Sequence, residues 1–157
     1  MKGQAQLFSH GKDDWETPQL FFEELNQEFE FNFDVCASLE NTKCMLYLTE
    51  HDDALSLEWN VEPITRAFCN PPYSQWQKFV EKAYYETFTL NNSVSVVMLL
   101  PARTDTKAFH KYIYNQPNVE IRFLKGRLKF ELGGKPVLDK KGKPQSAPFP
   151  SLVAIFR

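Results

Sequence analysis

The sequence predicts an α/β fold, a doubly wound and mostly parallel sheet with helices on its two faces. Segments of strand length alternate with segments of helical periodicity along the 157 residues. Residues 93–100 are apolar over almost their whole length, as a central parallel strand buried on both faces must be. A rigid turn at residues 69–74 follows a shorter apolar segment, a position at which open α/β sheets bind ligands.

The chain opens with a polar stretch, residues 1–12, which we expect to be a flexible lead-in to a single domain at residues 13–157. Thr17 is expected to cap a helix that begins at Pro18 and runs to about Phe29, because apolar residues recur there at helical spacing. The N–H groups at such a helix start can hold an anion. Thr17 therefore has two interpretations, a simple helix cap or part of an anion site.

Two strands are expected next. Residues 31–38 should form the first core strand and its exit loop, with Asp34 near the end of the strand. Residues 39–50 are too few for a full helix and strand, so we expect an abbreviated unit whose strand is residues 45–48.

The turn after the following strand, residues 64–68, is the richest in chemical information. Pro71 and Pro72 fix φ at about −65° and remove two N–H donors, and Pro71 keeps Asn70 out of the helical region. The free polar groups are therefore mostly acceptors, the Asn70 amide oxygen and the backbone carbonyls, and Tyr73 adds a flat aromatic face. A planar ligand with an amino group, such as adenine, suits these groups. Two acceptors on its N–H bonds would free the nitrogen lone pair for attack.

The remaining elements follow in order. They are a helix at about 75–89, the strand at 93–100, a helix at 106–115 capped by Thr104 or Asp105, a strand at 119–124, a hairpin at 128–137 that turns on Gly133 and Gly134, an exposed loop at 138–150 and a buried last strand at 151–156. Arg103 follows the strand 93–100 and is placed to reach a phosphate or a target base.

The net charge of −2 conceals a division along the chain. Residues 13–62 hold fourteen acidic residues and one basic residue, whereas residues 63–157 hold fifteen basic and six acidic residues. The first part suits a cationic ligand and the second suits phosphate. For the basic stretch at residues 120–143, the alternative is an ordinary solvated surface.

Cys36, Cys44 and Cys69 lack CxxC spacing, and we expect reduced, buried thiols in a cytosolic protein. The histidines are scattered, so no metal site is expected. No apolar run reaches the ~18 residues of a membrane span, and residues 1–6 lack the apolar core of a signal peptide.

The turn Asn70-Pro71-Pro72-Tyr73 resembles the signature of amino-group methyltransferases that use S-adenosylmethionine. With residues 14–18 (DWETP), residues 100–104 (LPART) and the last strand, the chain is similar to the small phage-type DNA N-6-adenine methyltransferases over nearly its whole length. The resemblance implies a Rossmann-like methyltransferase fold with an antiparallel last strand. It also implies S-adenosylmethionine as cofactor and double-stranded DNA as partner, with the target adenine flipped out of the duplex. The expected location is the cytoplasm, that of the host cell if a phage encodes the chain.

The resemblance also assigns roles to residues of this chain. The catalytic set is Asn70, Pro71, Pro72 and Tyr73. The cofactor-binding set is Trp15, Thr17, Pro18, Asp34, Cys36, Ala37, Ser38, Asp53 and Asn70. Small side chains stand where methyltransferases usually have a glycine-rich turn after the first strand, and Glu50 is a weak match for the acid that holds the ribose. Asp53, with Asp52 second, matches an acid near the cofactor adenine, and simple capping of a helix by Asp53 is the alternative.

DNA contact is expected from the basic hairpin and loop at residues 125–147 and from Arg103, since 157 residues leave no room for a separate recognition domain. The residues expected to make it are Arg103, Lys125, Arg127, Lys129, Lys140 and Lys141. A homodimer would extend this surface. Two other functions remain open: methylation of an RNA base or a protein glutamine, and binding of DNA or cofactor without catalysis.

Overall fold

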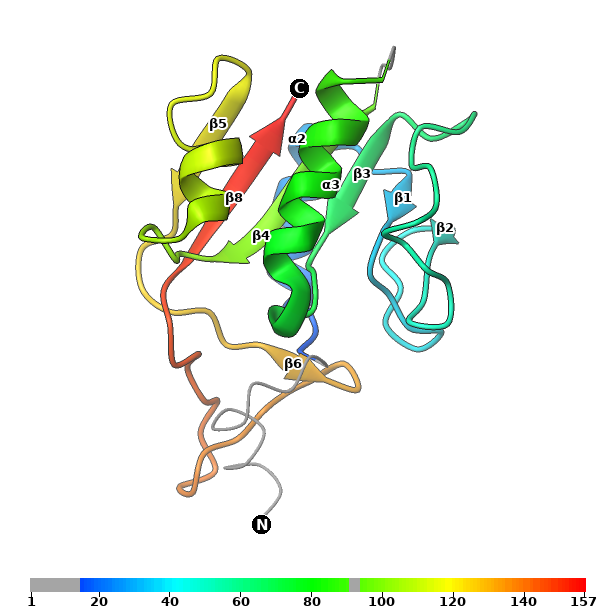
Figure 1. Ribbon diagram of the computed structural model, residues 1–157. Coiled ribbons are helices and arrows are strands. Elements are labelled where there is room, and N and C mark those ends of the chain that lie inside the picture. The colour runs from blue at the N-terminus through cyan, green and yellow to red at the C-terminus, as the bar shows by residue number, and fades with distance from the viewer. Residues whose placement is uncertain (1–14, 91–93) are drawn as a thin grey trace.

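The structure is a computed structural model, and it describes residues 15–90 and 94–157. Its centre is a six-stranded sheet in the order β2-β1-β3-β4-β8-β5 (Figure 1). The strands are β1 (Phe33–Asp34), β2 (Leu46–Tyr47), β3 (Arg66–Cys69), β4 (Ser95–Pro101), β5 (Val119–Phe123) and β8 (Ser151–Phe156). Strands β2, β1, β3 and β4 are parallel, and β8 runs antiparallel to both β4 and β5. The predicted mostly parallel sheet and its antiparallel last strand are confirmed.

The two faces of the sheet have separate apolar cores. The helical elements are α2 (Gln19–Phe29), η1 (Tyr73–Gln75), α3 (Trp76–Phe88) and the π-helical η2 (Phe109–Ile113). Val96, Met98 and Leu100 of β4 belong to the core under α3 and η2, whereas Val97 and Leu99 belong to the core that includes α2. In Figure 1, α3 crosses the front of the sheet and α2 lies behind it. Because both faces are covered, β4 has to be apolar throughout, as its sequence indicated.

A two-stranded hairpin lies outside the main sheet. It consists of β6 (Glu131–Leu132) and β7 (Lys135–Pro136), and it turns on Gly133 and Gly134, both of which have positive φ. In Figure 1 it lies below the carboxyl ends of β3 and β4. The hairpin was expected at this place in the chain. The loop after it was expected to be exposed throughout, which is wrong at its end, since Ala147 and Phe149 are buried.

In the acidic half of the chain, the expected Thr17 cap and the alternative of a helix capped by Asp53 are both wrong. Helix α2 begins at Gln19, and Pro18 rather than Thr17 occupies the cap position, without a side-chain cap hydrogen bond. A helix capped by Asp53 does not form, because residues 51–59 make turns. Asp53 instead accepts a hydrogen bond from the Ser56 hydroxyl at 2.5 Å and remains exposed.

The segment after β4 differs from its prediction in two details. The helix at residues 106–115 is reduced to η2 and the residues just before it. Its cap is Thr106, whose hydroxyl accepts the Phe109 N–H at 3.3 Å and donates to the Arg103 carbonyl at 2.8 Å. Thr104 and Asp105 therefore do not cap it. The cysteines are free thiols as expected, but only Cys69 is fully buried.

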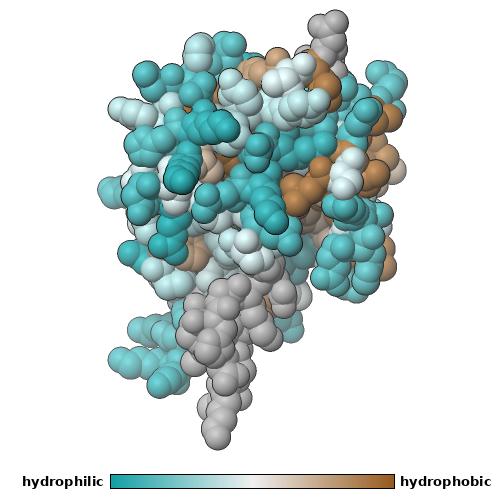
Figure 2. All heavy atoms as spheres, in the orientation of Figure 1, coloured by the Kyte–Doolittle hydropathy of each residue, from teal (hydrophilic) through white to brown (hydrophobic). Residues whose placement is uncertain are grey.

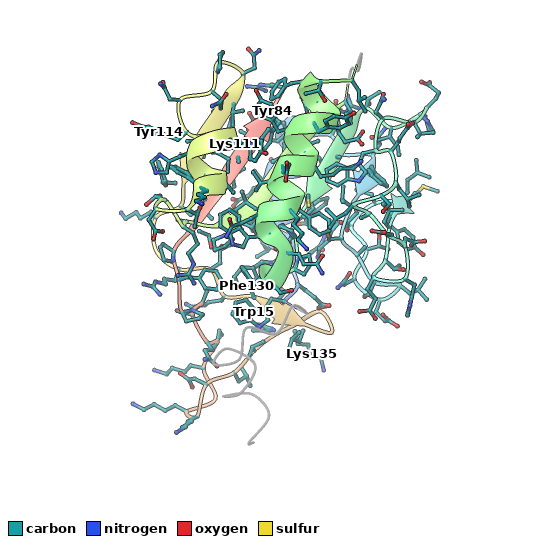
Figure 3. The ribbon with its side chains drawn as sticks, in the orientation of Figure 1. Trp15, Tyr84, Lys111, Tyr114, Phe130 and Lys135 are labelled. Atoms are coloured by element: carbon teal, nitrogen blue, oxygen red, sulfur yellow. The ribbon has the colours of Figure 1, made fainter. Side chains whose placement is uncertain are left out.

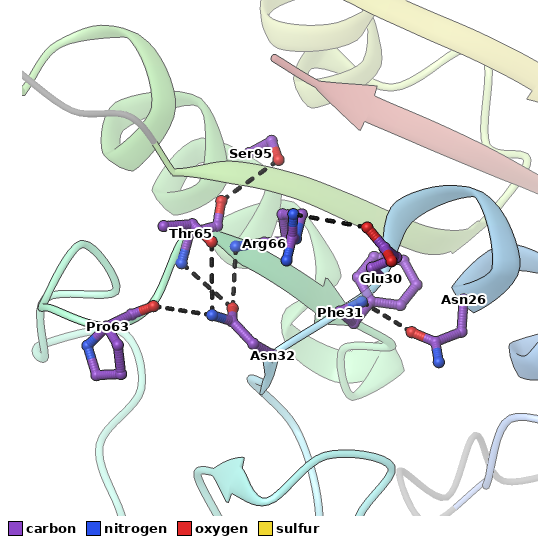
Figure 4. Close-up of polar contacts among 8 residues, drawn as sticks. All are labelled: Asn26, Glu30, Phe31, Asn32, Pro63, Thr65, Arg66 and Ser95. Carbon is purple, nitrogen blue, oxygen red and sulfur yellow. Dashed lines mark hydrogen bonds and ion pairs between the residues drawn. The ribbon is translucent and has the colours of Figure 1, made fainter.

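Asn32 aligns β1 with β3, the two strands that lead to the site (Figure 4). Its Oδ1 accepts the N–H groups of Thr65 and Arg66 at 3.2 and 3.1 Å, and its Nδ2 donates to the Pro63 carbonyl at 2.8 Å. The start of β1 is thereby tied to the start of β3. The register that follows pairs Asp34 with Phe68 and brings the ends of the two strands together.

Replacing Asn32 with alanine should lower the free energy of unfolding by about 1–3 kcal/mol, because two backbone N–H groups and one carbonyl lose their partner. Urea unfolding measures this loss. Asn118→Ala, at an exposed asparagine, is the matched control and should change stability by no more than about 0.5 kcal/mol. Equal stability of the two variants would contradict the role given to Asn32.

Candidate active site

The site forms where β1 and β3 end side by side. Strand β3 ends at Cys69, Asn70 leaves the sheet, and Pro72 has extended backbone angles (φ −60°, ψ 136°) before Tyr73 begins η1. Asp34 ends the neighbouring strand β1. A carboxylate and an amide thus meet at the carboxyl edge of the sheet, where the proline turn was expected to place them.

A hydrogen bond fixes the orientation of the Asn70 side chain. Its Nδ2 donates to the Trp15 carbonyl at 3.0 Å, so the amide oxygen is the end left to meet a ligand. Within residues 15–90 and 94–157, no group donates to Asn70 Oδ1 or to the Pro71 carbonyl. The Pro72 carbonyl, in contrast, accepts the Gln75 N–H at 3.0 Å. Among the described residues, the turn therefore has two neighbouring acceptors that no donor occupies.

Four aromatic rings, those of Trp15, Tyr73, Phe130 and Phe149, form a cluster against this turn. The Tyr73 ring meets the rings of Trp15 and Phe149 edge-on, with centroids 4.8 and 4.7 Å away. Trp15 stacks on Phe130 at 5.5 Å and on Phe149 at 5.4 Å. Figure 3 shows Trp15 and Phe130 together below the sheet, beside β6. Burial raises the pKa of the Tyr73 phenol well above its usual value, so Tyr73 stays neutral.

Two pockets flank the turn. The first, which we call the Asp34 pocket, encloses about 250 Å³ and is lined by Trp15, Glu16, Thr17, Asp34, Cys36, Asn41, Lys43, Phe68 and Asn70. The second, the Tyr73 pocket, encloses about 610 Å³ and is lined by Trp15, Tyr73, Trp76, Pro101, Arg103, Pro148 and Phe149. Trp15 belongs to both. Both pockets are open to solvent, and these volumes include that open space. Asn70 lines the first pocket and Tyr73 the second, so the turn lies between the two.

Asp34 is the electrostatic centre of the first pocket. Its carboxylate accepts the Lys43 N–H at 2.9 Å and the Cys36 N–H at 3.4 Å. Burial raises the Asp34 pKa to about 6, against the lowering effect of these N–H groups. Asp34 is consequently mostly ionised at pH 7, and its buried negative charge can hold a cation.

The structure gathers many of the residues that the sequence singled out. Trp15, Thr17, Asp34, Cys36 and Asn70 line the Asp34 pocket, and Tyr73 and Arg103 line the Tyr73 pocket. Pro18, Ala37, Ser38 and Asp53 line neither pocket. The Ala37 N–H is bonded to the Leu48 carbonyl and the Ser38 N–H to the Asn41 side chain, so both serve the loop itself.

The basic residues lie on the surface near the hairpin. Arg103, Lys125, Arg127, Lys129, Lys140 and Lys141 are all exposed. The Arg103 guanidinium lies over the Phe149 ring at 5.9 Å, which brings it beside the Tyr73 pocket. In Figure 2, hydrophilic side chains project from the lower end of the molecule, where Figure 1 places the loop after β7. Arg122, although part of the basic stretch, is paired with Glu28 and Glu120.

Sequence reasoning missed several residues of the pockets. Asn41 and Lys43 lie in a loop whose sequence has no periodicity, so nothing marked them as site residues. Glu16 lies between Trp15 and Thr17, which were assigned to the cofactor site, but Glu16 itself was given no role. Pro148 and Phe149 were assigned to an exposed loop. An aromatic residue between two prolines in an otherwise polar loop was the one available signal.

Within the described part of the chain, no group of three or more His, Cys, Asp or Glu side chains could hold a metal ion. Among the same residues, no helix is long and apolar enough to cross a membrane.

A mostly parallel α/β sheet with two adjoining pockets beside the turn at its carboxyl edge fits a Rossmann-like fold. Residues 4–157 match the family of DNA N-6-adenine-methyltransferases (Dam), and the chain belongs to this family. The DNA N-6-adenine-methyltransferase of Haemophilus phage HP1 (strain HP1c1) is 31% identical over 157 aligned positions, 92% of this chain and 86% of the phage protein. That of Escherichia phage T1 is 30% identical over 124 positions, 78% of this chain and 49% of that protein. The family predicted from the sequence is confirmed.

Asp34→Asn provides a test of the buried charge. The folded pKa of about 6 lies above the ordinary value of 3.8, so the ionised carboxylate disfavours the folded state. The stability of wild type relative to the variant should be highest below about pH 4 and should fall by about 3 kcal/mol as the pH rises through 6, because only wild type carries the Asp34 carboxyl. Urea unfolding of both proteins between pH 4 and 8 measures it. A difference between them that does not vary with pH would contradict the assignment.

Proposed function

We propose that the protein transfers a methyl group from S-adenosylmethionine to the exocyclic amine of adenine in DNA. In this proposal the Asp34 pocket holds the cofactor and the Tyr73 pocket receives a flipped-out adenine. The observation that carries the proposal is the position of Asn70 Oδ1. The bond from Asn70 Nδ2 to Trp15 fixes this oxygen at the boundary of the two pockets, and no donor from residues 15–90 or 94–157 occupies it.

The donor set of the Asp34 pocket fits a cationic cofactor with one carboxylate. Asp34 supplies negative charge for the sulfonium or ammonium group, and Lys43 supplies the positive partner for the carboxylate. S-adenosylmethionine, when bound, supplies an electrophilic methyl group. The acidic character of residues 13–62 supports this location for it.

The turn activates the acceptor by hydrogen bonding alone. Adenine's amino lone pair is delocalised into its ring and is a poor nucleophile. Asn70 Oδ1 and the Pro71 carbonyl accept the two N–H bonds and favour a tetrahedral nitrogen whose lone pair is free. Acceptors at this point also stabilise the positive charge that develops on nitrogen. The carbon–sulfur bond of the cofactor would break as the carbon–nitrogen bond forms, S-adenosylhomocysteine would leave, and the acidic proton on the methylated nitrogen would pass to water, so no strong general base is required.

Stacking in the Tyr73 pocket would offset part of the free-energy cost of removing a base from the duplex. Flipping costs a few kcal/mol, and stacking on an aromatic side chain returns about 1–3 kcal/mol. Tyr73, Trp76 and Phe149 supply the aromatic walls, and Arg103 at the rim suits the phosphate of the extruded nucleotide.

The proposed DNA surface is attached to the same aromatic cluster. Phe130 precedes the hairpin, and Phe149 follows the basic loop, so both ends of the segment that carries Lys140 and Lys141 are anchored on Trp15. Phosphates bound by that segment would therefore lie beside the Tyr73 pocket.

Asn70→Ala should reduce methyl transfer to unmethylated DNA by about 100-fold or more, because one of two acceptors on the amine is lost. Tyr73→Ala should reduce it by about 10- to 100-fold through lost stacking. Transfer of tritiated methyl groups from S-adenosylmethionine measures both, with Asn118→Ala as the exposed control.

Parallel reactions with RNA and with protein as acceptors extend this test. Equal incorporation into DNA by wild type and all three variants would refute the roles of Asn70 and Tyr73. Preferential labelling of RNA or protein would replace DNA as the substrate. Tight cofactor binding without transfer to any acceptor would indicate a non-catalytic binding protein.

The proposed contact of the loop at residues 139–143 with DNA can be tested separately. Lys140→Ala with Lys141→Ala should weaken DNA binding at low salt and lower the slope of log affinity against log salt by about 2, since two phosphate contacts are lost. Fluorescence anisotropy across a salt series measures this slope. Lys111→Ala, on η2 away from the hairpin in Figure 3, is the control and should leave it unchanged. Identical slopes in all three proteins would exclude the loop from the DNA surface.

A further inference from the structure

The segment Trp15–Thr17 joins the hairpin to the catalytic turn, and one residue of it makes most of the contacts to the hairpin. We propose that Glu16 is a positioning residue that sets the hairpin β6–β7, and with it bound DNA, in one place relative to Asn70. The inference rests on the proposed function, and the experiment below separates the failure of one from the failure of the other.

Glu16 holds the hairpin through both its backbone and its side chain. Its N–H donates to the Glu131 carbonyl at 3.0 Å, and the Glu131 N–H donates to the Glu16 carbonyl at 3.1 Å. Its carboxylate Oε1 accepts the Gly134 N–H at 2.9 Å. Three hydrogen bonds from one residue thus reach the first strand and the turn of the hairpin.

The hairpin depends on these contacts for its position. Its strands have two residues each, and it is not hydrogen-bonded into the six-stranded sheet. A two-stranded hairpin of this size is marginal by itself in water. Packing of Phe130 on Trp15 anchors its base, and the bond from Gly134 to Glu16 is what holds its turn.

The other end of the same segment touches the reacting groups. Trp15, directly before Glu16, provides the carbonyl that orients the Asn70 amide. Glu16 itself also lines the Asp34 pocket. A displacement of the hairpin turn is therefore transmitted through two consecutive residues to the acceptor on the target amine, and a misplacement of about 1 Å at such a site can cost about 100-fold in rate.

This arrangement makes the two ligands interdependent. DNA bound to the hairpin would move Glu16, which lines the Asp34 pocket. Cofactor bound in that pocket would in turn affect the position of the hairpin through Glu16. Because coupling of binding free energies is reciprocal, DNA and cofactor should each change the affinity for the other, and by the same factor.

The substitution pair Glu16→Ala and Glu16→Gln tests the role. Glutamine keeps a side-chain oxygen that can accept the Gly134 N–H, whereas alanine removes it. Glu16→Ala should lower kcat by about 10- to 100-fold and abolish the mutual effect of DNA and S-adenosylmethionine on binding. Glu16→Gln should restore kcat to within about threefold of wild type. Glu24→Ala, at an exposed glutamate of α2, is the matched control and should behave as wild type.

Hydrogen exchange of the Gly134 amide gives a readout that needs no turnover. Exchange should be slow in wild type and Glu16→Gln and fast in Glu16→Ala, while thermal unfolding shows whether each variant is folded. A Gln variant as inactive as the Ala variant, with its Gly134 amide still protected, would overturn the proposal in favour of direct contact between the Glu16 charge and the cofactor. Unchanged kcat in the Ala variant would overturn it as well. Wild type that transfers no methyl group to DNA would refute the proposed function alone, since exchange and coupled binding would still decide the role of Glu16.

Discussion

The hydrogen bond from Asn70 Nδ2 to the Trp15 carbonyl determines which end of the Asn70 amide can meet a ligand. An amide that is free to rotate offers a donor half of the time, and a donor would repel an amino group. The bond exists because the segment at Trp15 lies against the hairpin on one side and the proline turn on the other. Pro71 and Pro72 make the backbone of the turn rigid. The orientation of the Asn70 side chain, however, is set by the carbonyl of Trp15, 55 positions earlier in the chain.

The aromatic cluster shows how this long-range contact is maintained. Its rings come from four separate segments of the chain, and each ring belongs to a segment with a different task. Trp15 carries the carbonyl, Tyr73 belongs to the turn, and Phe130 and Phe149 bracket the basic segment. Aromatic contacts of this kind contribute about 0.5–1.5 kcal/mol each beyond their burial, and they also fix relative orientation. The contacts that pack this part of the core thus also set the geometry of the candidate site.

Local patterns explain what could be predicted. Strand β4 follows from its unbroken apolar run, the hairpin from two glycines, and the stiffness of the turn from Pro71 and Pro72, since each depends on residues adjacent in sequence. Two of the failures involve partners distant in sequence. The start of α2 was displaced because residues before it pair with Glu131, and Phe149 was misjudged because its burial depends on Trp15. Periodicity in a short polar segment, such as residues 51–59, cannot distinguish a capped helix from a series of turns.

The lining of the two pockets has a further consequence for how such proteins can diverge. Every residue of the Asp34 pocket lies between positions 15 and 70, whereas the Tyr73 pocket, apart from Trp15, is built from positions 73 to 149. A genetic crossover near the proline turn would exchange the surroundings of one ligand and leave those of the other intact. The two halves would still have to pack together, because β3 pairs with β4 across such a junction and the Trp15 indole borders both pockets.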